Sequence, residues 1–159
     1  MNILPTVNIL STVTLSDVPL SDYSKEKEEK AIKEATEKGF NVIRADFDTL
    51  LVDLDNEEDV NVFNDNIEMI ENKFGIRSFS YWNSKSGYPH IHVKVQLGHG
   101  VDNNQRTALE LALGSDPKRG ILNVKKTMGY YQPLSPSLLL VPPNAIITEV
   151  LEKPFFIKM

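Results

Sequence analysis

The stretch HIHVKVQL, residues 90–97, alternates polar and apolar side chains with a period of two. Successive side chains of a β-strand point to opposite faces, so this pattern predicts a strand that is buried on one face only. His90 and His92 should therefore point the same way, while Ile91 and Val93 lie on the other side. The question that this strand raises is what requires two imidazoles side by side.

The rest of the chain predicts one α+β domain over 25–159, preceded by an arm at 1–24 that is rich in Ser, Thr and Pro. β-branched and aromatic residues predict strands, and apolar residues at helical spacing with Ser, Asn or Asp caps predict helices. We expect helices over 25–38, 56–75 and about 103–113, and a short helix that begins after Asp116. Strands are expected over 40–45, 49–54, 76–84, 90–97, 137–143 and 144–152.

Strand, helix, strand, strand, helix, strand is the order of a ferredoxin-like split β-α-β sheet, antiparallel and with helices on one face. In that topology the first and third strands are neighbours in the middle of the sheet. The first carries Asp53 and Asp55, which are again two residues apart. If the registers agree, these carboxylates meet His90 and His92 on the sheet surface that no helix covers.

Adjacent carboxylates repel, and a divalent ion between them relieves the repulsion. Mg²⁺ and Mn²⁺ prefer oxygen ligands, and imidazole widens the choice of metal, so we expect Asp53, Asp55 and His92 to hold Mg²⁺ or Mn²⁺. Phosphoryl transfer on nucleic acid or nucleotides is the natural hypothesis for such a site. The alternatives are that DLDN forms only a strand end with an Asx turn, and that both histidines are inert and face solvent.

The net charge of −5 argues against a protein whose whole surface coats nucleic acid. Arg106, Lys118 and Arg119 remain candidates for template or triphosphate contacts, although charged runs are commonly only solvated helix faces. Cysteine is absent, which excludes thiolate ligands and favours a cytoplasmic protein. No run approaches the roughly 18 apolar residues of a membrane span, and the start does not look like a signal peptide.

DLDN at 53–56 and SKSGYPHIHV at 84–93 resemble the archaeo-eukaryotic primase and primase-polymerase superfamily. That family carries an Asp-hydrophobic-Asp/Glu motif on one strand and a Ser-x-His motif on the neighbouring strand. The resemblance implies that Asp53 and Asp55 hold the metal ions and that His90 or His92 contacts the phosphates of a nucleotide. The family usually has a third acidic motif on a later strand, whereas Asp116 in LGSDPKR looks more like a helix cap.

Ser84, Ser86 and the backbone around Gly87 stand directly before the histidine strand. A glycine allows backbone N–H groups to come close to a ligand, so we expect these residues to line a phosphate path.

GYPHIHVKV is also similar to the metal-binding strand of the His-hydrophobic-His endonucleases of rolling-circle replication initiators and relaxases. By that resemblance the nucleophile would be Tyr130 or Tyr131. The chain departs from the pattern, because Gln132 and Pro133 follow where these enzymes generally place a lysine on a helix. The alternative is that the tyrosines only pack at a helix end.

Both families use a palm-like sheet of ferredoxin/RRM-like topology. Because DLDN is intact and the tyrosine context departs from the endonuclease pattern, we favour a primase-polymerase-like replication protein that acts on nucleic acid and nucleoside triphosphates. By association with these families, other replication proteins are possible partners and a virus or plasmid a possible source. A third hypothesis is an inactive palm that only binds a partner.

Overall fold

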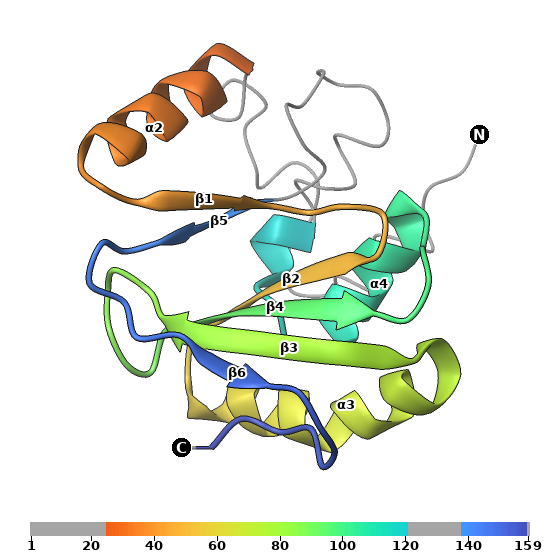
Figure 1. The fold of residues 1–159 in the computed structure, drawn as a ribbon. Helices are drawn as coiled ribbons and strands as arrows, with labels where there is room; N and C mark the ends of the chain where they lie inside the picture. Colours follow the sequence, from red (N-terminus) through yellow and green to blue (C-terminus); the bar gives the residue numbers. More distant parts are fainter. Residues whose placement is uncertain (1–24, 121–137, 159) are drawn as a thin grey trace.

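Figure 1 shows the chain as a computed structural model, which describes residues 25–120 and 138–158. The expected arm at 1–24 lies outside the described residues. In chain order the elements are α2 (Lys25–Glu37), β1 (Asn41–Arg44), β2 (Thr49–Leu54), α3 (Glu57–Phe74), β3 (Ile76–Asn83), β4 (Ile91–Leu97), α4 (Asn103–Ala112), β5 (Leu138–Val141) and β6 (Thr148–Val150). The chain is an α+β protein with antiparallel sheets, as the sequence predicts.

The larger sheet has the strand order β2-β4-β3-β6, and every neighbouring pair is antiparallel. β2 lies beside β4, which confirms that the aspartate strand neighbours the histidine strand. β2 forms an edge of this sheet, whereas the sequence predicts a position in the middle. The difference arises because the last strand, β6, pairs with β3 and not with β2. β1 and β5 form a separate two-stranded sheet (Figure 1).

Side chains of α4 occupy the free edge of β2 where a further strand would otherwise pair. Arg106 Nε donates a hydrogen bond to the carbonyl oxygen of Thr49 at 3.1 Å, and Glu110 Oε2 accepts one from the backbone N–H of Leu51 at 2.8 Å. Both α4 side chains are buried. An open strand edge invites pairing with another chain, and here polar side chains satisfy its backbone groups instead.

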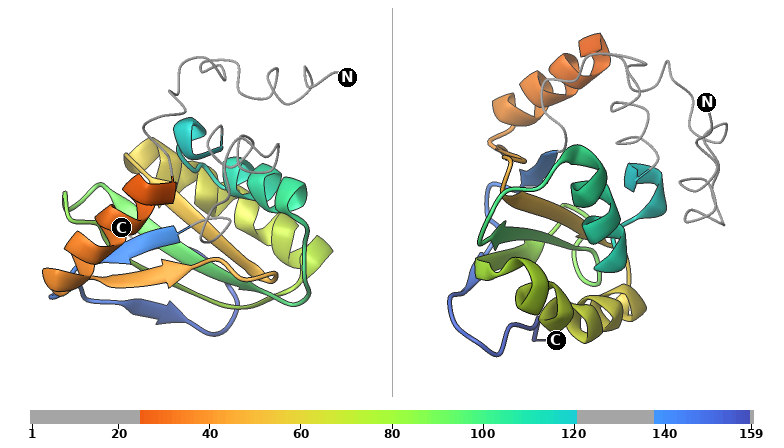
Figure 2. Two further views of the ribbon diagram at one scale, coloured as in Figure 1. Left: turned by 90° about the horizontal axis from the view of Figure 1, so that it is seen from above. Right: turned by 90° about the vertical axis from the view of Figure 1, so that its right-hand side faces the viewer.

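α3 covers one face of the larger sheet because its apolar residues recur every three or four positions. It begins after Asn56, whose side chain accepts from the N–H of Asp59 at 2.8 Å, and it ends at Gly75. The views in Figure 2 show α3 and α4 on the side of the sheet opposite to the β1–β5 ribbon. The main core includes Leu50, Val52, Leu54, Val60, Phe63, Ile67, Ile70, Phe79, Ile91, Val93, Val95 and Leu97.

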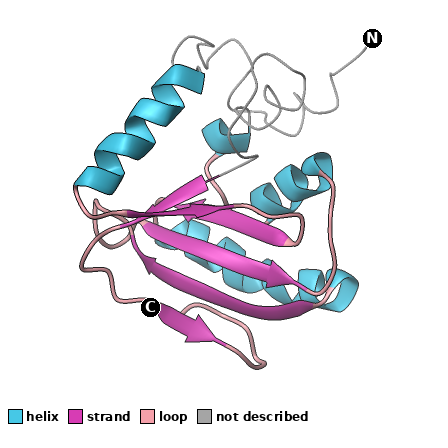
Figure 3. Cartoon of the chain, turned by 45° about the horizontal axis from the view of Figure 1, so that its top comes forward, coloured by secondary structure: helices cyan, strands magenta, loops and turns pink. Residues whose placement is uncertain are grey.

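The small β1–β5 sheet packs over part of the opposite face (Figure 3). There Leu51 of β2 and Trp82 of β3 are buried against Leu139 and Val141 of β5. The face of the larger sheet opposite to α3 therefore carries a second, smaller apolar cluster. No helix in the described part of the chain is both long enough and apolar enough to cross a bilayer.

Candidate active site

Asp53 and His92 lie directly opposite each other in the β2–β4 ladder. Their side chains alternate with the core residues of both strands, so they point to the face that α3 does not cover. His92 Nε2 is 3.4 Å from Asp53 Oδ1, and both side chains are largely buried. The juxtaposition that the sequence predicts for this pair is confirmed.

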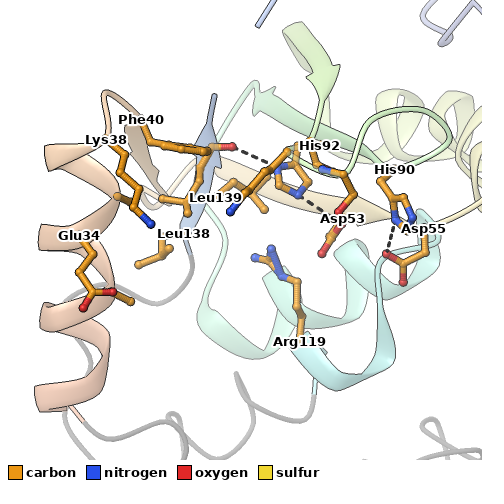
Figure 4. Close-up of a pocket in the computed structure, with 16 residues that line it drawn as sticks. Glu34, Lys38, Phe40, Asp53, Asp55, His90, His92, Arg119, Leu138 and Leu139 are labelled. Carbon is orange, nitrogen blue, oxygen red and sulfur yellow. Dashed lines mark hydrogen bonds and ion pairs between the residues drawn. The ribbon is translucent and has the colours of Figure 1, made fainter. Parts of the chain in front are cut away.

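Asp55 and His90 form the equivalent pair one step further along, where the two strands end. His90 Nδ1 lies 3.6 Å from Asp55 Oδ1, and each of these side chains is nearly half exposed. The two Asp–His pairs appear together in Figure 4, on one side of a shared hollow. Two carboxylates and two imidazoles thus meet on one surface, as expected from the period of two in each strand.

The carbonyl oxygen of Leu140 sets the orientation of the His92 ring. His92 Nδ1 is 3.2 Å from this oxygen, and Trp82 Nε1 donates to the same oxygen at 3.2 Å. A carbonyl can only accept, so Nδ1 must carry a proton and donate it. Nε2, the other ring nitrogen, is then the one turned toward Asp53. Nε2 is therefore the ring nitrogen that can serve as a metal ligand beside Asp53.

The surroundings of Asp53 favour its ionised form. Burial by itself raises the pKa of this carboxyl, but the hydrogen bond to His92 and the electrostatic interactions with His92, Arg119 and His90 outweigh burial. The pKa of Asp53 is therefore lowered from its ordinary value. This carboxylate stays charged at neutral pH without any bound metal.

The surroundings of Asp55 act in the opposite direction. Burial and the negative charges of Asp53, Asp116 and Asp59 raise the pKa of the Asp55 carboxyl, and His90 offsets only part of this effect. Asp55 thus lies in a field of like charges, which is the condition that a bound divalent cation relieves.

A tight turn brings the segment after α4 against β2. The N–H of Asp116 donates to the carbonyl oxygen of Asp53 at 3.0 Å, and Ser115 Oγ accepts from the N–H of Asp53 at 3.0 Å. Gly114 permits this approach, since its φ is +91° and a Cβ there would lie 2.8 Å from the carbonyl oxygen of Asp59. Asp116 therefore lies near the aspartate pair, although from the sequence we interpret it as a helix cap.

Asp116 also keeps the capping role, because its Oδ1 accepts from the N–H of Lys118 at 3.0 Å. Its negative charge nevertheless contributes to the raised pKa of Asp55. The sequence contains no separate signal for this second role, since Asp before Pro reads equally well as a simple helix start.

The loop that joins β3 to β4 folds back on itself through its own backbone. The N–H of Ser84 donates to the carbonyl oxygen of His90, the N–H of Gly87 to that of Ser84, and the N–H of His90 to that of Gly87, each at 2.9 Å. Ser84, Lys85 and Ser86 line the same cavity as the two Asp–His pairs. Gly87 adopts a φ of +77° in this turn and does not line the cavity.

The three basic candidates have different positions. Arg119 lines the cavity and faces Asp53 in Figure 4. Lys118 is exposed and does not line it. Arg106 is buried, and its guanidinium donates to the backbone of Thr49 and Asp46. The structure thus brings Arg119 to the site and holds Arg106 beneath β2, where it serves the fold.

The cavity has a volume of about 520 Å³ and opens between the larger sheet and α2 (Figure 4). Some of its lining has no motif-like signal in the sequence, because packing between distant segments brings it there. These additional lining residues are Ala31, Glu34, Ala35, Lys38, Phe40, Leu138, Leu139 and Leu140.

The ligand types at the two pairs suit a divalent cation of the Mg²⁺ or Mn²⁺ class. Carboxylate oxygens dominate, and one imidazole nitrogen, His92 Nε2, is turned toward Asp53. Within residues 25–120 and 138–158, no three acidic or histidine side chains are grouped closely enough to form a metal site by themselves. Such ions commonly take only one or two protein carboxylates, with water and substrate phosphates completing the shell, so an open site of this kind fits them.

Comparison of the chain with known proteins gives no match to a family model, to a curated protein or to a solved structure. Tyr130 and Tyr131, the candidate nucleophiles of the endonuclease hypothesis, lie outside the described residues. The chemistry of the site therefore has to follow from its own residues.

Proposed function

We propose that the chain is a divalent-cation-dependent enzyme of nucleotidyl or phosphoryl transfer, with nucleic acid and nucleoside triphosphates as substrates. The observation that carries this proposal is the pairing of Asp53 with His92 and of Asp55 with His90 on the face of the larger sheet opposite to α3. The resemblance of the same residues to primase-polymerase motifs supports it.

The arrangement of the central elements also supports a palm of the ferredoxin/RRM-like type. β2, α3, β3, β4 and α4 follow each other in the expected order, and β4 lies between β2 and β3. The last strand departs from the expected arrangement, since β6 borders β3. The neighbouring strands β2 and β4, which carry both Asp–His pairs, are adjacent as in a palm, although β2 lies at the edge of the sheet.

In this proposal Asp53 and Asp55 hold Mg²⁺ or Mn²⁺, with His92 Nε2 next to Asp53. The ion, when bound, neutralises phosphate charge and lowers the pKa of an attacking hydroxyl. Ser84 and Ser86 hydroxyls donate hydrogen bonds to phosphate oxygens along the β3–β4 loop. Arg119 adds a fixed positive charge near Asp53, on the side away from His92 (Figure 4).

Calorimetric titration with Mn²⁺, with and without a nucleoside triphosphate, tests the proposal. We expect the wild type to bind Mn²⁺ more tightly in the presence of the triphosphate and D53A/D55A to lose binding. Asp65→Asn is a matched control, because Asp65 is an exposed carboxylate on α3. Failure of the wild type to bind Mn²⁺ under either condition would contradict the proposal.

The endonuclease remains the second candidate, because His90 and His92 also share one face as that class requires. Here H90A/H92A should abolish Mn²⁺ binding while D53A/D55A retains it, and His99→Ala is the control histidine. A covalent adduct with single-stranded DNA that disappears in Y130F/Y131F would support this alternative. Retained nucleic-acid binding in all of these variants, without turnover, would point to the inactive palm.

A further inference from the structure

The cavity at the two Asp–His pairs has two chemically different walls. One wall is polar and includes Asp53, His92 and Arg119 with the serines of the β3–β4 loop. The other is mainly apolar and comes from α2, from Phe40 just before β1, and from β5 (Figure 4). A volume of about 520 Å³ is within the range of small-molecule sites, which is roughly 300–1,000 Å³.

We propose that the apolar wall is the subsite for the base of a bound nucleoside triphosphate, with its phosphates at the polar wall. This inference rests on the proposed function and extends it, because it assigns a role to residues outside both Asp–His pairs. The subsite consists of Ala31, Ala35, Phe40 and Leu138–Leu140, called the α2–β5 wall from here on.

The shape of the α2–β5 wall follows from how α2 ends. The N–H of Phe40 donates to the carbonyl oxygen of Ala35 at 3.0 Å, so the chain turns sharply after α2, and both residues line the cavity. Phe40 stays partly exposed while Ala35 is buried. A partly exposed aromatic ring beside small alanine side chains suits a flat base, since every base offers a π-face for stacking.

The distance between the two walls is held by hydrogen bonds. The carbonyl oxygen of Leu140 in the α2–β5 wall accepts from both His92 Nδ1 and Trp82 Nε1. The antiparallel pairing of β1 with β5 then ties this strand to the segment that follows Phe40. The apolar wall is thus fixed to a side chain of the polar wall, as a ligand with one charged and one flat end requires.

Charged side chains at the rim distinguish this ligand from a purely apolar one. Glu34 of α2 and Lys38, which directly follows this helix, line the same cavity, and both are labelled beside the α2–β5 wall in Figure 4. A carboxylate accepts hydrogen bonds and an ammonium group donates them. These groups match the donors and acceptors at the edge of a base, which a simple hydrocarbon lacks.

Comparing two ligands, one with a base and one without, distinguishes binding of the base from binding of the phosphates. We would measure binding of a nucleoside triphosphate and of inorganic triphosphate, each with Mn²⁺, to the wild type, to Phe40→Ala and to Ala31→Gln. We expect both variants to weaken nucleotide binding by about tenfold, the size of a lost base–aromatic contact, and to leave inorganic triphosphate unchanged. Ala31→Gln fills the wall with a neutral side chain at an exposed helical position, so it serves if Phe40→Ala fails to fold.

Phe47→Ala is the control, because Phe47 is an exposed phenylalanine that does not line this cavity. If the wild type binds both ligands and neither wall variant changes their ratio, the base subsite is wrong while the metal and phosphate site stands. If the wild type binds neither ligand, the proposed function fails and the subsite fails with it.

Discussion

The two Asp–His pairs use the same residue types two positions apart, yet their surroundings differ. Asp53 and His92 lie within the ladder, largely buried, whereas Asp55 and His90 lie at the strand ends and are nearly half exposed. The pKa of Asp53 is lowered and that of Asp55 is raised. The comparison shows that the strand position of each pair, more than its composition, decides how its charge is balanced.

The largest effect that separates the two pairs should be on cation affinity. Loss of an outer-shell partner typically costs about 10–100-fold in metal affinity, so loss of a ligand at the buried pair should cost more than about 100-fold. We expect this of Asp53→Asn, and a clearly smaller loss of Asp55→Asn, because water can replace an exposed ligand more readily. Calorimetry with Mn²⁺ measures both, and equal losses would show that the two pairs act as one.

A pH titration of stability sharpens the comparison, because Arg119 interacts electrostatically with both Asp53 and the buried Glu110. Burial raises the pKa of Glu110. Arg119, the Leu51 N–H and Arg106 offset only part of this effect, so that the resulting pKa is about 7. A raised carboxyl pKa gives stability that is full below the unfolded-state pKa and is lost as the pH rises through 7.

We therefore expect the free energy of unfolding of the metal-free wild type to fall by about 2 kcal/mol more than that of Glu110→Gln between about pH 5 and pH 8. The glutamine keeps an oxygen that can accept from Leu51 but does not titrate. Urea unfolding at several pH values measures the difference. Parallel curves for the two proteins would mean that Glu110 does not change its protonation in this range.

Trp82→Phe should destabilise the surroundings of the buried Asp53–His92 pair and leave the Asp55–His90 pair unchanged. It removes the donor to the Leu140 carbonyl oxygen, and loss of one such hydrogen bond costs about 1 kcal/mol of unfolding free energy. Tyr81→Phe is a control on the neighbouring position of β3, because its hydroxyl contacts the backbone N–H of Lys158 and not the site. Urea unfolding of both variants measures the cost, and an equal loss would assign it to general packing.

The smallest effect concerns the opposite directions of the Asp53 and Asp55 pKa shifts in the metal-free protein. The lowered pKa of Asp53 gives stability that is present above the unfolded-state pKa and lost as the pH falls through the folded-state value. The raised pKa of Asp55 gives the opposite dependence. At neutral pH, Asp53→Asn should therefore lower the thermal midpoint and Asp55→Asn should raise it slightly. Shifts of the same sign would remove the electrostatic difference between the pairs.

Much of the site could be predicted from local pattern. The period of two in TLLVDL and in HIHVKVQL predicts which side chains share a face, and the structure confirms that Asp53 lies opposite His92. Arg106 is the instructive failure. A basic residue on a helix after the histidine strand suggests a phosphate contact, but the guanidinium is buried and donates to the backbone carbonyl oxygens of Thr49 in β2 and of Asp46 before it. Side-chain charge alone does not reveal whether a partner is a substrate or the chain's own carbonyl groups.

The edge position of β2 was not predictable from the order of the elements. The same order is compatible with a strand on either side of β2, and the choice depends on contacts from α4 and from β6. From the sequence, Glu110 is only a polar helix residue and Arg106 a candidate phosphate contact, and neither pattern indicates that they pair with the edge of β2.

The sequence by itself determined the α+β class, the strand periodicity and the two residue pairs, because these depend on local dihedral preferences and on which neighbours share a face. Only the tertiary structure decided that Leu140 orients His92, that Arg119 faces Asp53 and that Phe40 stands across the cavity. These contacts join segments far apart in the chain. Their geometry depends on how the sheets pack, which no local pattern contains.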